Sequence, residues 1–279
     1  MFSGMSDEIM DRLQWAFDRL YGYFPRVLEP HAVDPLLVGH RGVFEHPELV
    51  ENTLPAFDLA VSLGGGIEFD LHLTNDDVPV VLHDPNLSRL HGSAGVVRDL
   101  RLAELQELAP SVPTLDELLD RYGHQCPHYF IEPKVRSERD RYVLARALRA
   151  SLQRSRLTSI STLISPDPKM LDTGRHEFPE LAKVHIFFVD PRAAVEYAKK
   201  HKDTGLAGWY FTFPEGCRDF LKSRGLHQGV GQIDYLNTHH HFRNRGFRYH
   251  FTNRIDRLVR PTEPLTLPAL TPPLVGTLT

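Results

Sequence analysis

Residues 66–84 read GIEFDLHLTNDDVPVVLHD and contain two short runs in which apolar residues dominate. Runs of this length, at 66–71 and 79–83, are typical of strands whose two faces are covered by helices. Similar runs alternate with segments of helical spacing on both sides of this stretch. Repeated alternation of strand and helix predicts a parallel sheet built of strand–helix–strand units.

We expect eight or nine strands within about 220 residues, which fits a closed (β/α)8 TIM barrel better than a doubly wound sheet. The predicted strands are 36–39, 66–71, 79–83, 129–134, 159–164, 183–189, 208–213, 231–236 and 247–251. The predicted helices are 54–63, 102–108, 115–122, 138–151, 166–175, 191–201, 215–224 and 239–245. The fold class is therefore α/β, as a single barrel domain.

The barrel is expected to occupy only part of the chain. We assign residues 1–34 to an N-terminal helix and lead-in, 35–260 to the barrel and 261–279 to a proline-rich tail. The tail contains five prolines and no periodic pattern. Such a composition predicts an extended strap or a disordered segment.

A helix is predicted before the first strand, in residues 5–24. Apolar residues recur there at helical spacing, opposite a polar face. We expect this helix to close the bottom of the barrel. The alternative is a peripheral membrane contact through Trp15, Phe17 and Tyr23, which the acidic character of the helix disfavours.

The composition narrows the range of partners. The 279 residues include 32 Lys and Arg against 36 Asp and Glu, and the basic residues are scattered. Nucleic-acid binding needs a clustered basic face, so we expect no nucleic-acid partner. The first ten residues lack the apolar run of a signal peptide, and no stretch approaches the roughly 20 apolar residues of a membrane span. We therefore expect a cytoplasmic protein without a transmembrane segment, and the sequence does not fix its oligomeric state.

Titratable side chains stand where predicted strands end. They come from four strands: His40 and Arg41, Glu68 and Asp70, His83, and Glu132 with Lys134. The carboxyl ends of all barrel strands meet at one rim, where the active sites of barrel enzymes lie. The sequence therefore predicts one site to which four strands contribute.

Three carboxylates of this set predict a metal site. Glu68 and Asp70 lie two residues apart on one strand and point to the same face. If Glu132 joins them, the three negative charges repel one another unless a cation neutralises them. Oxygen-only ligands suit Mg²⁺ or Ca²⁺ better than zinc. We therefore predict a divalent cation, Mg²⁺ or Ca²⁺, held by these carboxylates.

The remaining side chains of the set suit phosphate chemistry. Arg41 and Lys134 beside a metal would form a seat for a phosphate group. An ion pair with a glutamate of the site is the alternative role of Lys134. His40 and His83 titrate near neutral pH, so one can act as base or nucleophile and the other as acid to the leaving oxygen.

Five ordered motifs in this chain resemble those of the glycerophosphodiester phosphodiesterase family. They are His40-Arg41-Gly42, Glu51-Asn52-Thr53, Glu68-x-Asp70, Pro79-Val80-Val81-x-His83-Asp84 and Glu132-x-Lys134. The resemblance is dense from residue 36 to about 135 and thin afterwards. It implies His40 and His83 as the catalytic pair, Glu68, Asp70 and Glu132 as metal ligands, Arg41 and Lys134 at the phosphate, and Glu51 as the residue that holds the polar network.

The chain departs from the family pattern in three places. Asp234 stands where the family commonly has a tryptophan in a W-x-x-N pattern. A Thr-Asp pair near the end of the barrel becomes Thr252-Asn253, and Pro133 stands between Glu132 and Lys134. The departures leave the catalytic set whole and concern the part of the pocket that receives the alcohol.

The resemblance implies metal-dependent hydrolysis of a small-molecule phosphodiester, with glycerol 3-phosphate and an alcohol as products. The first alternative is a lysophospholipase D or sphingomyelinase D type of activity on lysolipids. The second is a catalytically silent barrel that binds phosphate ligands. The chain retains both motif histidines and all three carboxylates, which disfavours the silent barrel.

Overall fold

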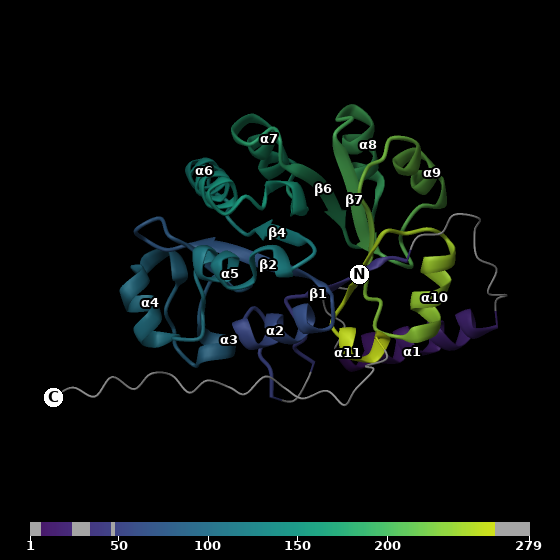
Figure 1. The fold of residues 1–279 in the computed structure, drawn as a ribbon, viewed down its shortest axis with the longest axis horizontal. Helices are drawn as coiled ribbons and strands as arrows, with labels where there is room; N and C mark the ends of the chain where they lie inside the picture. Colours follow the sequence, from purple (N-terminus) through teal and green to yellow (C-terminus); the bar gives the residue numbers. More distant parts are fainter. Residues whose placement is uncertain (1–6, 24–33, 46–47, 260–279) are drawn as a thin grey trace.

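The computed structural model describes residues 7–23, 34–45 and 48–259. Eight parallel strands form a closed barrel, and helices surround it (Figure 1). In sheet order, the barrel strands are β1 (Leu36–His40), β2 (Gly66–Leu73), β4 (Tyr129–Pro133), β5 (Ser161–Ser165), β6 (Ala182–Phe187), β7 (Thr204–Trp209), β8 (Gln228–Gly231) and β9 (Tyr249–Thr252). β1 closes the barrel because it pairs with both β2 and β9. The predicted TIM barrel is confirmed.

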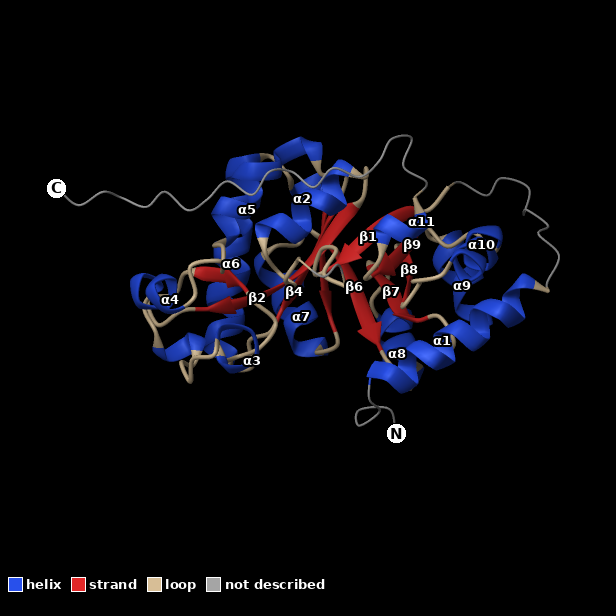
Figure 2. Cartoon of the chain, turned by 90° about the horizontal axis from the view of Figure 1, so that it is seen from below, coloured by secondary structure: helices blue, strands red, loops and turns tan. Residues whose placement is uncertain are grey.

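Helices cover the outside of the strands, as the two colours of Figure 2 show. The helices that follow barrel strands other than β2 are α2 (Leu54–Ser62), α6 (Glu138–Ser155), α7 (Pro168–Glu177), α8 (Arg192–Lys200), α9 (Glu215–Ser223), α10 (Leu236–Asn244) and α11 (Ile255–Leu258). Capping residues mark several of the starts. Ser137, for example, accepts a hydrogen bond from the Asp140 backbone at the start of α6.

Between β2 and β4 the chain makes an excursion from the barrel. β3 (Pro79–Val81) pairs antiparallel with the end of β2 and so is no barrel strand. The excursion continues through α3 (Ser88–His91), α4 (Leu102–Leu108) and α5 (Leu115–Tyr122). Its small core consists of Val80, Leu82, Leu87, Val97, Leu105, Ala109 and Val112. The prediction that His83 ends a barrel strand is therefore wrong, since an antiparallel arm carries this residue.

The barrel strands alternate between an inner and an outer core. The inner core consists of Val38, Phe130, Ile164, Val184, Ala207 and Phe251. On β2, Ile67, Phe69 and Leu71 belong instead to the large core beneath the helices. Successive side chains of a strand point to opposite faces, so Glu68 and Asp70 face the inside of the barrel.

The last third of the barrel deviates most from the predicted boundaries. β7 and β8 begin at Thr204 and Gln228, where the sequence predicted 208 and 231. The aromatic residues Tyr210, Phe211 and Phe213 follow β7 and pack in a cluster with Phe17 and Tyr21 of the N-terminal helix. Their apolar character reflects this contact outside the strand. It explains why the sequence predicted β7 too late in the chain.

α1 (Asp7–Gly22) is the predicted N-terminal helix, and it lies beside α10 (Figure 1). The Phe17 ring centroid lies 6.1 Å from that of Tyr210. The side-chain amide of Gln14 donates to Gln232 Oε1 over 2.6 Å. Tyr210 and Gln232 directly follow the carboxyl ends of β7 and β8. The expectation that this helix closes the bottom of the barrel is therefore wrong.

No helix among the described residues is long and apolar enough to cross a membrane. The cytoplasmic location, the domain boundaries near residues 35 and 260 and the absence of a nucleic-acid partner stay predictions. The predicted tail at 261–279 lies outside the described residues.

Candidate active site

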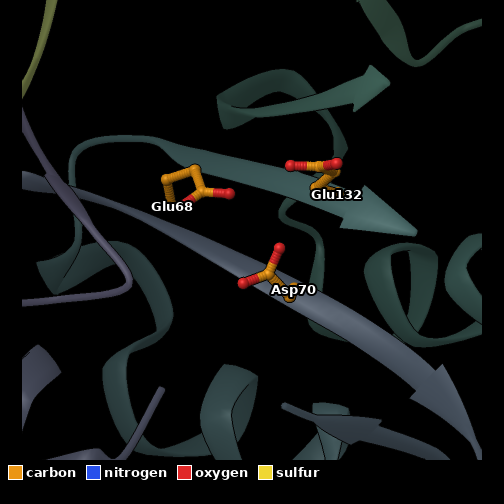
Figure 3. A group of neighbouring side chains, drawn as sticks. All are labelled: Glu68, Asp70 and Glu132. Carbon is orange, nitrogen blue, oxygen red and sulfur yellow. The ribbon is translucent and has the colours of Figure 1, made fainter. Parts of the chain in front are cut away.

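The three carboxylates predicted to bind a metal converge at the mouth of the barrel (Figure 3). Asp70 of β2 lies directly opposite Glu132 of β4 in the sheet register, and Glu68 precedes it on the same face. One oxygen of each carboxylate lies within 4.8 Å of an oxygen of the others. Glu68 is 2% exposed, Asp70 is 1% exposed and Glu132 is 7% exposed. Three acids are thus held together out of water.

The electrostatics of this acidic cluster favour a bound cation. Burial, followed by the charge of Asp70, raises the pKa of Glu132 to about 7. Burial and the charges of Asp70 and Glu132 also raise the pKa of Glu68. Burial opposes ionisation of Asp70 too, but Lys134 and Arg41 outweigh it and lower its pKa. A divalent cation would relieve the repulsion, and the oxygen-only donor set fits a hard ion.

The two basic residues of the site, Lys134 and Arg41, each contact a different carboxylate oxygen of Asp70. Lys134 Nζ lies 3.0 Å from Asp70 Oδ1 and donates to Glu132 Oε1 over 2.7 Å. Arg41 Nε lies 3.4 Å from Asp70 Oδ2. The ion pair considered as an alternative role of Lys134 is therefore present. Both basic side chains remain partly exposed at the mouth, as a contact with phosphate requires.

Two residues with unusual backbone conformations donate hydrogen bonds to the acidic cluster. Arg41 and Asn52 have φ values of 56° and 57°, which few residues other than glycine adopt. The Asn52 backbone donates to the Arg41 carbonyl over 3.0 Å and joins the two turns. As a result, the Arg41 backbone donates to Glu68 Oε2 over 3.1 Å, and Asn52 Nδ2 donates to Asp70 Oδ2 over 2.9 Å.

Glu51 links the acidic cluster to the excursion that carries His83. Its Oε1 accepts hydrogen bonds from Arg41 Nη1 over 3.1 Å and from Arg89 Nη2 over 2.6 Å. Burial raises the pKa of Glu51, but Arg89 and Arg41 lower it further than burial raises it. This geometry supports the predicted role of Glu51 in holding the polar network.

His83 is oriented by its immediate neighbours in the chain. Asp84 Oδ1 lies 2.8 Å from His83 Nδ1, and Arg89 Nε donates to Asp84 Oδ2 over 2.6 Å. The bond from Arg89 is the main reason that the pKa of Asp84 falls to about 2. His72 lies outside the acidic cluster, with its Nε2 3.0 Å from the His83 carbonyl oxygen.

His40 ends β1 directly opposite Glu68 in the register of β1 and β2. Its Nε2 lies 4.0 Å from Glu68 Oε2, and its Nδ1 lies 2.8 Å from Asn253 Oδ1. Burial, followed by the charge of Arg41, lowers the pKa of His40 to about 4. The ring is therefore neutral near pH 7.

Two hollows meet at the acidic cluster. Beyond His40, Glu68 and Glu132, the first is mostly apolar and is lined by Ile164, Ile186, Phe187, Phe188, Trp209 and Phe251. The second has more charged side chains in its lining, which includes His72, His83, Arg98, Lys134, Arg136 and Asp140 among others. Glu132 and Phe188 line both hollows, which therefore adjoin. The two hollows therefore leave space on both sides of the cluster.

Four residues to which we assigned no site role from the sequence contact the predicted ones: Asn52, Asp84, Arg89 and Asn253. Asn52 and Asp84 belong to the quoted motifs, so their position beside Glu51 and His83 was the available signal. Asn253 was visible only as a departure from the family pattern. Arg89 lies in no motif, and we find no sequence signal for it.

A model of the Glycerophosphoryl diester phosphodiesterase family matches residues 40–227, which include every predicted site residue. The chain belongs to this family. A glycerophosphodiester phosphodiesterase of Bacillus subtilis is 32% identical over 143 residues, which make up 44% of this chain and 47% of that protein. The chain thus spans less than half the length of this relative.

Solved structures extend the likeness over most of the fold. The glycerophosphodiester phosphodiesterase of Thermotoga maritima is 27% identical, with a TM-score of 0.66 over 81% of this chain and 97% of that one. An Oleispira antarctica phosphodiesterase, solved in complex with the product sn-glycerol-3-phosphate, is 24% identical. Its TM-score is 0.69, over 80% of this chain and 95% of that one. The barrel is therefore the fold of this family.

Proposed function

We propose that this protein hydrolyses glycerophosphodiesters to glycerol 3-phosphate and an alcohol, and that it needs a divalent metal. The observation that carries the proposal is the buried cluster of Glu68, Asp70 and Glu132 with two histidines at its edge. Family membership supports the reaction class. The product bound to the Oleispira antarctica neighbour, which has the same fold, supports glycerol 3-phosphate as the product.

Glu68, Asp70 and Glu132 would hold the cation, and their oxygen ligands suit Mg²⁺ or Ca²⁺. When bound, such an ion supplies Lewis-acid polarisation of a phosphoryl oxygen. Arg41 and Lys134 reach into the same space and would exchange part of their contact with Asp70 for the charged phosphate oxygens. The substrate phosphate would thus bind above the acidic cluster.

The two histidines would transfer the protons. One accepts a proton from the attacking oxygen, which belongs to the neighbouring glycerol hydroxyl or to water. The other donates a proton to the oxygen of the leaving alcohol as its bond to phosphorus breaks. Attack by the glycerol hydroxyl gives a cyclic phosphate, which water then opens to glycerol 3-phosphate. Glu51 would hold Arg41 and Arg89 in place during these steps.

The reaction can be followed by ³¹P NMR with glycerophosphocholine and glycerophosphoethanolamine as substrates. Samples with Mg²⁺, with Ca²⁺ and with EDTA should be compared. We expect the glycerol 3-phosphate signal to grow with one or both metals and to be absent with EDTA. Equal turnover in EDTA would refute the metal requirement, and phosphocholine as the product would refute the proposed bond cleavage.

The family and its solved structures do not favour the two alternatives raised by the sequence. Lysophosphatidylcholine in a parallel NMR sample separates the first of them, because only a lysophospholipase D releases choline from it. If the protein hydrolysed this lipid and neither glycerophosphocholine nor glycerophosphoethanolamine, its substrate would be a lysolipid. A silent barrel would leave all substrates unchanged with either metal.

A further inference from the structure

We propose that Asn253 is a positioning residue that fixes the ring orientation and the tautomer of His40. The inference rests on the proposed catalytic role of His40. Barrel closure brings the two residues together, since β1 pairs with β9 and Gly39 lies opposite Thr252. The next residues, His40 and Asn253, thus leave neighbouring strands side by side, although 213 positions separate them in the sequence.

The contact between the two side chains is specific. His40 Nδ1 lies 2.8 Å from Asn253 Oδ1. A carbonyl oxygen only accepts hydrogen bonds, so this geometry requires the proton of a neutral ring to sit on Nδ1. The other ring nitrogen, Nε2, then carries a lone pair on the side of the acidic cluster, 4.0 Å from Glu68 Oε2.

Glu45 determines which end of the Asn253 amide faces His40. Asn253 Nδ2 donates to Glu45 Oε1 over 3.0 Å. If the amide were turned over, its oxygen would face the carboxylate oxygen of Glu45, and two acceptors would repel each other. Glu45 therefore directs the amide oxygen towards the imidazole.

The backbone of Asn253 is held as well. Asp234, which follows β8, is 5% exposed, and its Oδ1 accepts from the Asn253 backbone over 2.8 Å. The same oxygen accepts from the Thr252 hydroxyl over 2.8 Å. Glu45 after β1, Asp234 after β8, and Thr252 and Asn253 at the end of β9 thus form one brace. The brace fixes the amide at both its backbone and its side chain.

The two histidines of the site consequently differ in their supports. His83 Nδ1 faces the carboxylate of Asp84, whereas His40 Nδ1 faces a neutral amide. A carboxylate stabilises a protonated imidazole, whereas an amide carbonyl fixes a neutral tautomer without adding charge. The brace therefore specifies where the proton of His40 resides.

The tautomer can be read directly from the full-length protein labelled with ¹⁵N-histidine. Long-range ¹H–¹⁵N correlations distinguish Nδ1–H from Nε2–H rings, and His40→Gln identifies the signals of His40 among the 16 histidines. We expect the Nδ1–H tautomer in the native protein. In Asn253→Ala we expect the Nε2–H form to appear, and kcat to fall about 10- to 100-fold with a smaller change in KM.

A paired substitution guards against a merely structural effect. Asn253→Asp alone places a second carboxylate 3.0 Å from Glu45, so the side chain should turn away. Asn253→Asp combined with Glu45→Gln restores a donor to that oxygen and leaves an acceptor for His40. This double variant should recover the Nδ1–H signal at pH values where the imidazole is neutral, and with it most of the lost kcat. Asn75→Ala is the matched control, because Asn75 is exposed and donates to the Asp99 carbonyl away from the site.

Either of two spectra would overturn the proposal: an Nε2–H ring for His40 in the native protein, or an unchanged Nδ1–H ring in folded Asn253→Ala. Failure of the double variant to recover the native tautomer would also count against it. These NMR measurements do not depend on whether the protein is catalytically active. Full activity of His40→Gln would instead remove the catalytic role of His40 and leave the brace itself to be judged by the spectra.

Discussion

The supports of His40 and His83 come from very different parts of the chain. His83 takes its partner Asp84 from the next position, and Arg89 completes the support within the same excursion. His40 takes its partner Asn253 from the far end of the barrel, 213 positions away. The first support is local and charged, whereas the second depends on barrel closure and is neutral at the imidazole. Two histidines in one site therefore take their hydrogen-bond partners from separate parts of the chain.

The largest expected effect is the removal of either imidazole. His40→Ala and His83→Ala should each lower kcat for glycerophosphocholine by about 10²- to 10⁴-fold, because each loses a proton-transfer step. Neither side chain belongs to the hydrophobic cores, so the fold should persist. Steady-state kinetics with a thermal melt as the folding control measures both effects. A fully active double variant would refute the two-histidine mechanism.

A smaller effect is expected from Asp84→Asn, which makes the support of His83 neutral like that of His40. The amide cannot stabilise a positive charge on His83, so kcat should fall about 10- to 100-fold while KM changes less. The measurement is kcat and KM for glycerophosphocholine, with the exposed Asp99→Asn as control. If Asp84→Asn keeps the native kcat, the charged support has no catalytic role.

The acidic cluster between the histidines predicts a dependence of stability on pH. Burial holds the pKa of Glu132 at about 7, above its usual value of 4.5. The stability that this group contributes is therefore complete below pH 4.5 and is lost as the pH rises through about 7. The loss is on the order of 1–3 kcal/mol.

Denaturant titrations in EDTA measure this contribution as the difference in unfolding free energy between native protein and Glu132→Gln. The difference cancels the groups whose titration does not depend on Glu132, such as the buried His128 and His250. We expect it to shift in favour of Glu132→Gln as the pH rises, and added Mg²⁺ or Ca²⁺ to stabilise only the native protein. The exposed Glu196→Gln should follow the native curve at each pH. A difference that does not vary with pH would contradict the assigned electrostatics.

The smallest effect is expected from Arg89→Ala. This substitution removes the side chain that links Asp84, the partner of His83, to Glu51. Arg89 is 47% exposed, so solvent screens its ion pairs and limits their contribution. We expect kcat to fall about 2- to 10-fold, because Asp84 loses one of its two partners. Arg139→Ala, which removes an exposed arginine that bridges Asp77 and Asp140, is the control and should leave kcat unchanged. A loss as large as that of His83→Ala would mean that Arg89 itself contacts the substrate.

The same contrast explains what the sequence could and could not predict. Glu68, Asp70 and Glu132 were predictable, because strand periodicity fixes which residues share a face and barrel strands end at one rim. The contact between His40 and Asn253 depends on the register of β1 with β9 and so on closure of the whole barrel. Arg89 was not predictable, since an excursion with its own small core positions it.

The displaced boundaries have a similar origin. Tyr210 and Phe211 continue the apolar run of β7, but they leave the strand to contact Phe17 of α1. Local sequence cannot distinguish an apolar residue in a strand from one that packs against a distant helix. The prediction of β3 as a barrel strand was wrong for another reason. Its residues do form a strand, but this strand pairs antiparallel with β2 outside the barrel.

Isothermal titration calorimetry shows whether Glu68, Asp70 and Glu132 form a divalent-metal site. Mg²⁺ and Ca²⁺ are titrated into metal-free native protein and into Glu68→Gln, with Glu196→Gln as the control. We expect one ion to bind per chain in the native protein and in the control, and binding to be lost or greatly weakened in Glu68→Gln. Equal binding by Glu68→Gln, or no binding by the native protein, would mean that these carboxylates do not form a metal site.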